Sequence, residues 1–516
     1  MLRINHTTIK LFLNLFLALN IVVLIIFFFP IKQAHVILKD HAWDGLSRCN
    51  GSSKEYDSKL APGMRMAQEK GCTMCEVAPD LCQELGKENL KKALSYSGTN
   101  QRLQRVLAKL KRGERLTVGV VGGSVSKGFG IDREADYYPH TPTNLNRLVF
   151  DRLNTLFPAP NGVKVGDSGR TENMNSFING AQGGVGKCFR TDYFSLCYGE
   201  HLPEDMDLVL IELAINDEVL LRNINSYELM VRSLLDLPNK PAVMNLQVFA
   251  LKFNTVTNGG DMASGVAQLY DLPTLSLRNA LYPEVLRNSS LVDELFYVHP
   301  EGEVDTRHLS RKGHNLMGRI GAAYIDSQLC EMNQYEASIP NAASVPVDQL
   351  YPITPMPRIQ LNMKYNKDLT LPPIKPQCFS MNGKKHPLVP FENKGWNKWN
   401  WKAKNYLVSS VPGSRVKFRL HPTIGNVEVH YLRSYQYKLG SVRCWVDEEV
   451  DRAIKLDGFW QEPYNIGRAA TIRDDLTPGE HSLTCELLNE TADPEGGKEF
   501  RLISVMRRTI DCIISI

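Results

Sequence analysis

Apolar runs of strand length alternate with helical segments from residue 115 to about residue 335, and this alternation constrains the fold more than any other feature. The predicted strands are 116–121, 206–213, 242–249 and 273–277, and the predicted helices are 143–156, 226–237, 262–270 and 311–330. Strands that alternate with helices along a chain form a largely parallel sheet. We therefore expect residues 115–335 to form an α/β domain.

The remaining C-terminal part has a different character. Residues 336–375 are rich in proline and have little periodicity, which predicts a linker or a segment wrapped over the surface. Beyond them come short runs with alternating apolar residues, separated by turn residues and without helical segments. These runs contain Val416, Phe418 and Leu420, then Val427, Val429 and Tyr431, then Val442, Cys444 and Val446, and finally Leu483, Cys485 and Leu487. Residues 376–516 are therefore expected to form a second, all-β sandwich domain.

Near the N-terminus, residues 11–31 carry no charge. At 1.5 Å per residue, a helix of this length crosses a bilayer core of roughly 30 Å. Arg3 and Lys10 precede it without acidic residues, which favours a cytosolic tail at 1–10 and a single-pass type II membrane protein of the secretory pathway. A cleaved signal peptide is the alternative, but the apolar stretch is long and no small-x-small cleavage site follows.

All eleven cysteines follow the apolar segment, as expected for an oxidising lumen or the cell exterior. Glycosylation sequons at Asn50, Asn288 and Asn489 lie on the same side, and the odd number of cysteines leaves at least one thiol free or paired between chains. For Cys72, Cys75 and Cys82, disulfides are expected rather than a metal or redox site, because no second CxxC accompanies them. Residues 32–114 are predicted to form a lumenal stem, with a helix that places Leu103, Val106, Leu107 and Leu110 on one face.

Composition restricts the partners of the chain. The 516 residues carry a net charge of +4 and no basic tract with interleaved aromatic residues. Nucleic acid is therefore not an expected partner.

The candidate nucleophile is Ser124, in the stretch "VGVVGGSVSKGFG". The apolar strand 116–121 ends in Gly122 and Gly123, and glycines allow a sharp turn or the close approach of another group. Ser124 would then be displayed at the carboxyl end of a strand, where open α/β sheets bind their ligands. Taken alone, the stretch is also compatible with an ordinary Gly/Ser turn.

A serine hydroxyl needs a base, and "VDTRHLSRKGH" supplies Asp305 and His308 just ahead of a predicted helix. The spacing lets one short loop present the carboxylate to the imidazole, while Nε2 of His308 faces the serine. His314 is a rival base, but it lies inside the predicted helix and is expected to pack there.

Donors for an oxyanion are also present. "INGAQGG" offers the backbone N–H of Gly183 or Gly184, and "IELAINDE" ends a predicted strand with Asn216 nearby. An Asn after a strand is also a common turn or helix-capping residue.

The order of these four pieces resembles that of the SGNH (GDSL-type) hydrolases, over residues 115 to about 330. "GGSVS" matches the nucleophile block, "NGAQGG" the second block, "AIND" the third and "DTRHLSRKGH" the last. The resemblance implies a flavodoxin-like, three-layer α/β/α domain with a catalytic triad of Ser124, Asp305 and His308. It also implies an oxyanion hole at Gly184 and Asn216, with neither cofactor nor metal. Gly123 and Ala214 depart from the usual residues of their blocks, and neither change removes a catalytic group.

The expected substrate is an ester on a glycan or polysaccharide, most simply an O-acetyl group. The sandwich loosely resembles jelly-roll modules attached to carbohydrate esterases, and Trp396, Trp399 and Trp401 could stack on sugar rings. Packing at the domain boundary is the alternative for these rings. The same triad could also serve an O-acetyltransferase or a lipid esterase, and a catalytically inactive glycoprotein that serves as a binding scaffold stays open as well.

Overall fold

The computed structural model describes residues 71–132, 138–159, 174–183, 190–217, 219–401, 404–422, 425–462 and 465–510. All of them belong to one compact unit, Lys70–Ile516. The predicted tail at 1–10 and membrane span at 11–31 lie outside these residues. None of the described helices combines the length and apolar character that a membrane crossing requires.

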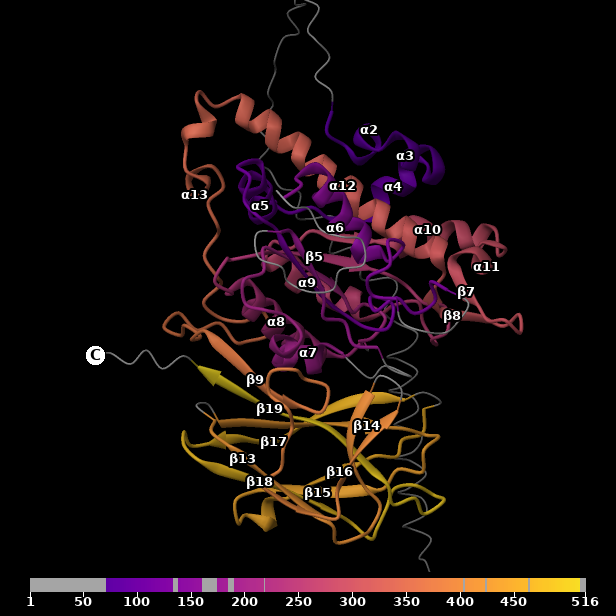
Figure 1. The fold of residues 1–516 in the computed structure, drawn as a ribbon, viewed down its shortest axis with the longest axis vertical. Coiled ribbons are helices and arrows are strands. Elements are labelled where there is room, and N and C mark those ends of the chain that lie inside the picture. Colours follow the sequence, from indigo (N-terminus) through magenta and orange to yellow (C-terminus); the bar gives the residue numbers. More distant parts are fainter. Residues whose placement is uncertain are drawn as a thin grey trace, which may run out of the picture. The chain divides into compact units, whose positions relative to one another are not determined.

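The first part of this unit is built on a six-stranded sheet (Figure 1). Five strands are parallel, and β1 (Leu94–Tyr96) pairs antiparallel with β6 at one edge. The parallel strands are β2 (Thr117–Gly122), β3 (Ser176–Asn179), β4 (Leu208–Glu212), β5 (Ala242–Gln247) and β6 (Thr274–Ser276). Their order across the sheet is β6-β5-β4-β2-β3, which is the flavodoxin-like order. The direction of winding changes between β2 and β4, and ligands of such sheets bind outside the carboxyl ends of the strands at this point.

Helices cover both faces of the sheet, so apolar residues of its central strands are buried on both sides. In β4, Leu208 and Leu210 enter one core cluster, whereas Val209 and Ile211 enter the other. The first cluster includes residues of α5 (Gln101–Lys111), α6 (Leu145–Leu156), α10 (Leu277–Arg287) and α12 (Arg311–Ala337). The second includes residues of α7 (Thr191–Cys197), α8 (Leu221–Leu235) and α9 (Gly259–Leu269). Because side chains alternate between the faces of a strand, this gives the predicted three layers.

The segment before β2 differs from the predicted stem. Residues 71–111 include α2 (Met74–Val77), α3 (Pro79–Leu85), α4 (Lys87–Ala93) and α5, and they pack into the α/β domain. Leu81, Leu90 and Leu107 are buried in its first core cluster, and the Cys72–Cys330 disulfide joins this segment to α12. The apolar face predicted for the helix therefore covers the sheet, and this stretch belongs to the domain.

Four disulfides connect described cysteines: Cys72–Cys330, Cys75–Cys82, Cys197–Cys378 and Cys444–Cys485. The expectation of disulfides at Cys72, Cys75 and Cys82 is confirmed. Cys49, Cys188 and Cys512 lie outside the described residues.

A two-stranded hairpin precedes α12. It consists of β7 (Phe296–Val298), which follows the short helix α11 (Leu291–Leu295), and β8 (Val304–Leu309). Phe296 pairs with Leu309, but the next residue, Tyr297, pairs with Asp305. The three residues at 306–308 therefore bulge out of the register of the hairpin. The Asp305–His308 segment, predicted as a loop, is in fact this irregular strand.

The predicted proline-rich linker lies against the α/β domain. The helix α12 extends to Ala337, and the chain then passes through η2 (Ala342–Ser344) and α13 (Val347–Leu350) before β9 begins. Arg232 donates to the carbonyl of Pro357 at 2.8 Å, and the N–H of Leu361 donates to Glu228 at 2.7 Å. Of the two predicted alternatives, the structure shows the wrapped segment.

The C-terminal part is a sandwich of two antiparallel sheets, as predicted. One sheet has the order β10-β13-β18-β15-β16, and the other has the order β11-β12-β19-β14-β17, with β9 also paired to β19. The strands are β9 (Ile374–Ser380), β10 (Glu392–Lys394), β11 (Asn397–Trp401), β12 (Lys404–Ser409), β13 (Arg415–Leu420), β14 (Gly425–Arg433), β15 (Ser441–Val446), β16 (Ile454–Asp457), β17 (Ile466–Leu476), β18 (His481–Leu487) and β19 (Phe500–Ile510), with η3 (Val450–Arg452) before β16. The alternating residues predicted for β13, β14, β15 and β18 are buried in the sandwich core. The helix α7 of the α/β domain packs on β9, β17 and β19 (Figure 1).

Candidate active site

Ser124 lies in a tight turn at the carboxyl end of β2. The N–H of Lys127 donates to the carbonyl of Gly123 at 3.0 Å, and the N–H of Phe129 donates to the carbonyl of Ser124 at 3.0 Å. A Cβ atom at Gly123 would overlap with the side-chain amide of Asn216. The second glycine of the turn is therefore required because Asn216, from the end of β4, lies directly beside the nucleophile turn.

Ser124 and His308 are 184 residues apart in sequence and are in contact in the structure. Ser124 Oγ lies 2.8 Å from Nε2 of His308, and Nδ1 of His308 lies 2.6 Å from Oδ2 of Asp305. The other oxygen of Asp305 accepts the N–H of Arg307 at 3.0 Å, which orients the carboxylate. The three predicted side chains are thus arranged as serine, imidazole and carboxylate, the geometry of a nucleophile with its base and the group that orients the base.

The bulge in β8 explains how Asp305 and His308 meet. In a regular strand, residues three apart point to opposite faces, so the two side chains would diverge. The extra residues at 306–308 turn His308 back towards Asp305. Gly130 allows the nucleophile turn to approach this bulge, because its φ is +93° and a Cβ atom there would overlap with the carbonyl of Leu309. The ring of Phe129 packs on the imidazole with a centroid distance of 4.3 Å.

The electrostatics of this pair suit a general base. Burial lowers the pKa of His308, and this outweighs the hydrogen bond and charge of Asp305, which raise it. For Asp305, burial raises the pKa, but the hydrogen bond and charge of His308 hold it well below its usual range. At neutral pH the carboxylate is therefore ionised and the imidazole is neutral, so Nε2 can accept the Ser124 proton.

The pH dependence of turnover follows from these directions. A protonated His308 cannot accept a proton, so kcat/KM should be constant near pH 7 and fall tenfold per pH unit below the His308 pKa. Because that pKa is lowered, we expect the midpoint of the decline to lie below about 6.5, the ordinary value for histidine. Hydrolysis rates of a small acetyl ester between pH 4 and 8 measure this midpoint. A midpoint above 7 would contradict a buried neutral base.

His314 is the rival base from the sequence, and it packs in α12 as expected. The side chain is fully buried, and its Nδ1 lies 3.4 Å from the backbone N of Leu145. Burial lowers its pKa to about 3. Ser124 contacts His308 instead, so we assign no catalytic role to His314.

Of the two predicted oxyanion donors, the structure describes Asn216. Asn216 lies in the turn after β4. β4 and β2 are neighbours in the sheet, and the direction of winding changes between them. Gly184 lies outside the described residues. The segment just before it is described, and the N–H of Gln182 donates to the carbonyl of Gly122 at 3.0 Å. Gln182, in the loop after β3, therefore lies beside the nucleophile turn, and the role of Gly184 stays a prediction.

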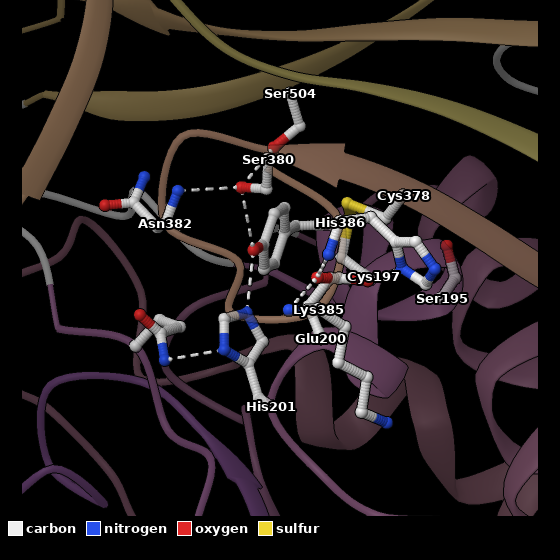
Figure 2. Close-up of a disulfide and its surroundings, with 12 residues drawn as sticks. Ser195, Cys197, Glu200, His201, Cys378, Ser380, Asn382, Lys385, His386 and Ser504 are labelled. Atoms are coloured by element: carbon white, nitrogen blue, oxygen red, sulfur yellow. Dashed lines mark hydrogen bonds and ion pairs between the residues drawn. A yellow bond between two sulfur atoms is a disulfide. The ribbon is translucent and has the colours of Figure 1, made fainter. Parts of the chain in front are cut away.

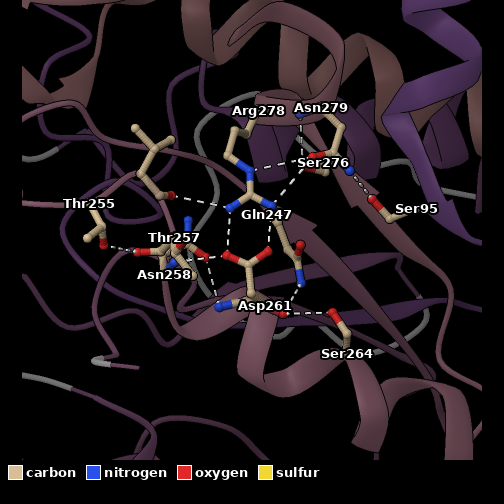
Figure 3. Close-up of polar contacts among 12 residues, drawn as sticks. Ser95, Gln247, Thr255, Thr257, Asn258, Asp261, Ser264, Ser276, Arg278 and Asn279 are labelled. Atoms are coloured by element: carbon tan, nitrogen blue, oxygen red, sulfur yellow. Dashed lines mark hydrogen bonds and ion pairs between the residues drawn. The ribbon is translucent and has the colours of Figure 1, made fainter. Parts of the chain in front are cut away.

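The Asn216 turn is held by the start of α9. The N–H of Gly259 donates to the carbonyl of Ala214 at 2.9 Å. Figure 3 shows how this helix start is fixed: Asp261 accepts two hydrogen bonds from Arg278 at 2.6 and 2.5 Å, and it also accepts the N–H of Asn258 at 2.9 Å. A bidentate pair of this kind restrains both partners in one orientation. The start of α9 thus holds the turn that carries Asn216.

A buried acidic residue that the sequence analysis did not single out is hydrogen-bonded to the nucleophile turn. Glu212, the last residue of β4, accepts both the N–H and the hydroxyl of Ser126, at 3.2 and 3.1 Å. Burial raises its pKa to about 8, against the lowering effect of the hydrogen bonds from Ser126. Its only sequence signal is an acidic residue that ends an otherwise apolar strand.

The three tryptophans differ in their surroundings. Trp396 is only 2% exposed and packs edge-on against Phe500 in the sandwich core, so its predicted contact with substrate is wrong. Trp399 is 38% exposed, and the guanidinium of Arg501 lies 4.5 Å from its ring centroid. The ammonium of Lys404 lies 4.8 Å from the ring of Trp401. Cations thus lie over the rings of Trp399 and Trp401, which reduces the aromatic surface open to a sugar.

Within the described residues, no group of three or more His, Cys, Asp or Glu side chains is placed to hold a metal ion. The arrangement around Ser124 supports acyl transfer through the chain's own side chains.

No family model matches the sequence, and no curated protein matches it. Solved structures do match. A two-domain esterase active on acetylated mannans matches over 82% of this chain and 98% of its own, with 18% identity and a TM-score of 0.55. A structure of a two-domain esterase active on acetylated mannans, co-crystallized with mannopentaose, matches over the same shares with 20% identity and a TM-score of 0.56. These similarities show that the chain has the fold of a two-domain esterase, so the predicted combination of an α/β domain and a β-sandwich is confirmed for the fold.

Proposed function

We propose that this chain is a serine esterase that removes O-acetyl groups from a polysaccharide or glycan. The observation that carries the proposal is the continuous contact from Ser124 Oγ to His308 Nε2 at 2.8 Å and from His308 Nδ1 to Asp305 at 2.6 Å. It lies where sheets of this order bind their ligands. The two similar esterases act on acetylated mannans, which supports the substrate class.

The reaction follows from the geometry in two halves. Ser124 Oγ attacks the acetyl carbonyl while His308 Nε2 takes its proton, and Asn216 stabilises the oxyanion of the tetrahedral intermediate. His308 then gives the proton to the sugar oxygen, which leaves, and the acetyl group stays on Ser124. In the second half, His308 takes a proton from water while the water oxygen attacks the acetyl carbonyl. The bond from the carbonyl carbon to Ser124 Oγ then breaks, and His308 gives the proton back to Ser124 Oγ. Acetic acid leaves and ionises to acetate, and the free enzyme is restored.

We further propose that residues 11–31 anchor the enzyme as a single-pass type II membrane protein, with the catalytic unit in the lumen of the secretory pathway or outside the cell. The uncharged segment and the basic residues before it support this orientation. The four disulfides support an oxidising compartment for the described residues. The anchor would keep the enzyme close to glycans that pass along or lie on the membrane.

The test is acetate release from acetylated mannan by the full chain in detergent micelles. We expect free acetate to accumulate in proportion to enzyme and time, with no dependence on added deacetylated mannan. Acetyl groups that appear on an added mannan acceptor without free acetate would identify a transferase. If acetate is not released and a fluorophosphonate does not label the protein, the esterase is refuted and a binding scaffold is favoured.

A further inference from the structure

A line of hydrogen-bonded side chains runs from the loop after β3 in the α/β domain to the β-sandwich (Figure 2). The side-chain nitrogen of Gln182 lies 3.1 Å from Nδ1 of His201, and Nε2 of His201 lies 2.7 Å from the hydroxyl of Tyr193. The hydroxyl of Tyr193 lies 3.4 Å from Oγ of Ser380, at the end of β9, and Ser504 of β19 donates to the same oxygen at 2.8 Å. We call this line the interdomain relay.

The catalytic end of the relay is held to the nucleophile turn. The N–H of Gln182 donates to the carbonyl of Gly122, two residues before Ser124, at 3.0 Å. The side chain of Gln182 also donates to the carbonyl of Gly180 at 3.1 Å. A shift of Gln182 would therefore be passed directly to the main chain that carries Ser124.

The two ring nitrogens of His201 have fixed hydrogen-bonding roles in the relay. Burial lowers the pKa of His201 to about 3, and the charges of Lys127, Lys384 and Lys385 lower it as well, so the ring is neutral. A neutral imidazole has one donor and one acceptor nitrogen. It can accept from Gln182 and donate to the hydroxyl of Tyr193, which lies 3.4 Å from Oγ of Ser380.

The sandwich end of the relay is held to the α/β domain by a disulfide and by several hydrogen bonds to Glu200. Cys378, two residues before Ser380, is bonded to Cys197 of α7. Glu200, next to His201, is 3% exposed at its side chain and accepts the N–H of Lys385 at 3.1 Å and of His386 at 2.8 Å. Nδ1 of His386 lies 2.5 Å from the same carboxylate (Figure 2). The backbone on both sides of the relay is thus held across the interface.

We propose that the sandwich is a working part of the catalytic centre, and that His201 and Tyr193 are positioning residues that hold the loop at 180–183 and the nucleophile turn in register. The inference rests on the proposed esterase function. A positioning role differs from a purely substrate-binding role of the sandwich in one measurable way. Loss of positioning lowers the turnover of esters that are too small to reach the sandwich, whereas loss of substrate binding there does not.

The test compares two substitutions that each remove one buried tyrosine hydroxyl. Tyr193→Phe breaks the relay and keeps the ring. Tyr198→Phe is the matched control, because among the partners that the structure describes its hydroxyl contacts only the carbonyl of Ser233, at 3.4 Å, and Ser233 is not part of the relay. On a small acetyl ester, we expect Tyr193→Phe to lower kcat by about tenfold or more with KM within twofold, since misplacement by ~1 Å can cost 10²-fold. The Tyr198→Phe enzyme should turn over like the wild type.

The outcomes separate this inference from the proposed function. If Ser124→Ala abolishes turnover and Tyr193→Phe leaves kcat unchanged, the positioning role is refuted and the esterase stands. If the wild type itself neither turns over esters nor reacts with a fluorophosphonate, the esterase fails first. Should Tyr193→Phe not fold, as judged by its thermal midpoint, Ser380→Ala replaces it from the sandwich side, with the same loss of kcat expected and the same refuting result.

Discussion

Ser124→Ala should lose about 10⁴-fold or more of kcat on acetyl esters, the largest effect that we expect of any single substitution. The substitution removes the atom that forms the acyl intermediate in the proposed reaction and leaves His308 without its proton donor. Ser124 is 7% exposed, and its side chain is small, so the loss of the hydroxyl should leave the fold intact. Acetate release and labelling by a fluorophosphonate measure the same nucleophile in two independent ways.

Ser233→Ala is the matched control for this experiment. Ser233 is also a buried serine, and its hydroxyl has no hydrogen-bond partner among the described residues. This variant should retain wild-type turnover and labelling. Equal labelling of Ser124→Ala and the wild type would mean that another residue is the nucleophile.

Asp305→Asn should lower kcat by about 10³- to 10⁴-fold with little change in KM. The carboxylate accepts the proton on Nδ1 of His308, which leaves Nε2 free to accept from Ser124. An amide of the same size can donate to Nδ1, and the proton then lies on Nε2, where it blocks the base. The carboxylate also stabilises the imidazolium that forms during the reaction, and an amide has no charge to do so.

Asp293→Asn makes the same chemical change at an exposed carboxyl of α11, close in sequence to the hairpin. It should leave kcat unchanged. If Asp305→Asn keeps its activity within about tenfold, His308 acts with Ser124 as a dyad, and the carboxylate has only a structural role.

The local sequence was sufficient to predict the strands β2 and β4 and the turn that carries Ser124. Neighbouring residues of a strand point to opposite faces of the sheet. A continuous apolar run of strand length therefore needs cover on both faces, and the run around Val209 and Leu210 predicts a buried parallel strand. The glycines before Ser124 likewise predict a tight turn. These signals are local, because they follow from the backbone geometry of a few adjacent residues.

The register of the hairpin could not be predicted in this way. The spacing of Asp305 and His308 is compatible with a loop, a helix or a bulged strand, and the pairing with β7 decides among them. Trp396 shows the same limit, because Trp396 and Trp399 have similar neighbours in sequence and only the packing of the two sheets buries the first.

By itself, the sequence predicted the alternation of strands and helices in the α/β domain, the identities of the candidate nucleophile, base and carboxylate, and the alternation that builds the sandwich. Only the tertiary structure decided which groups meet: Ser124 with His308, Glu212 with Ser126, Cys197 with Cys378, and Gln182 with the sandwich through His201 and Tyr193. The physical reason is that periodicity reports which face of an element is buried. Contacts between distant segments depend instead on how the elements cross and on their register, and neighbours in sequence do not encode these.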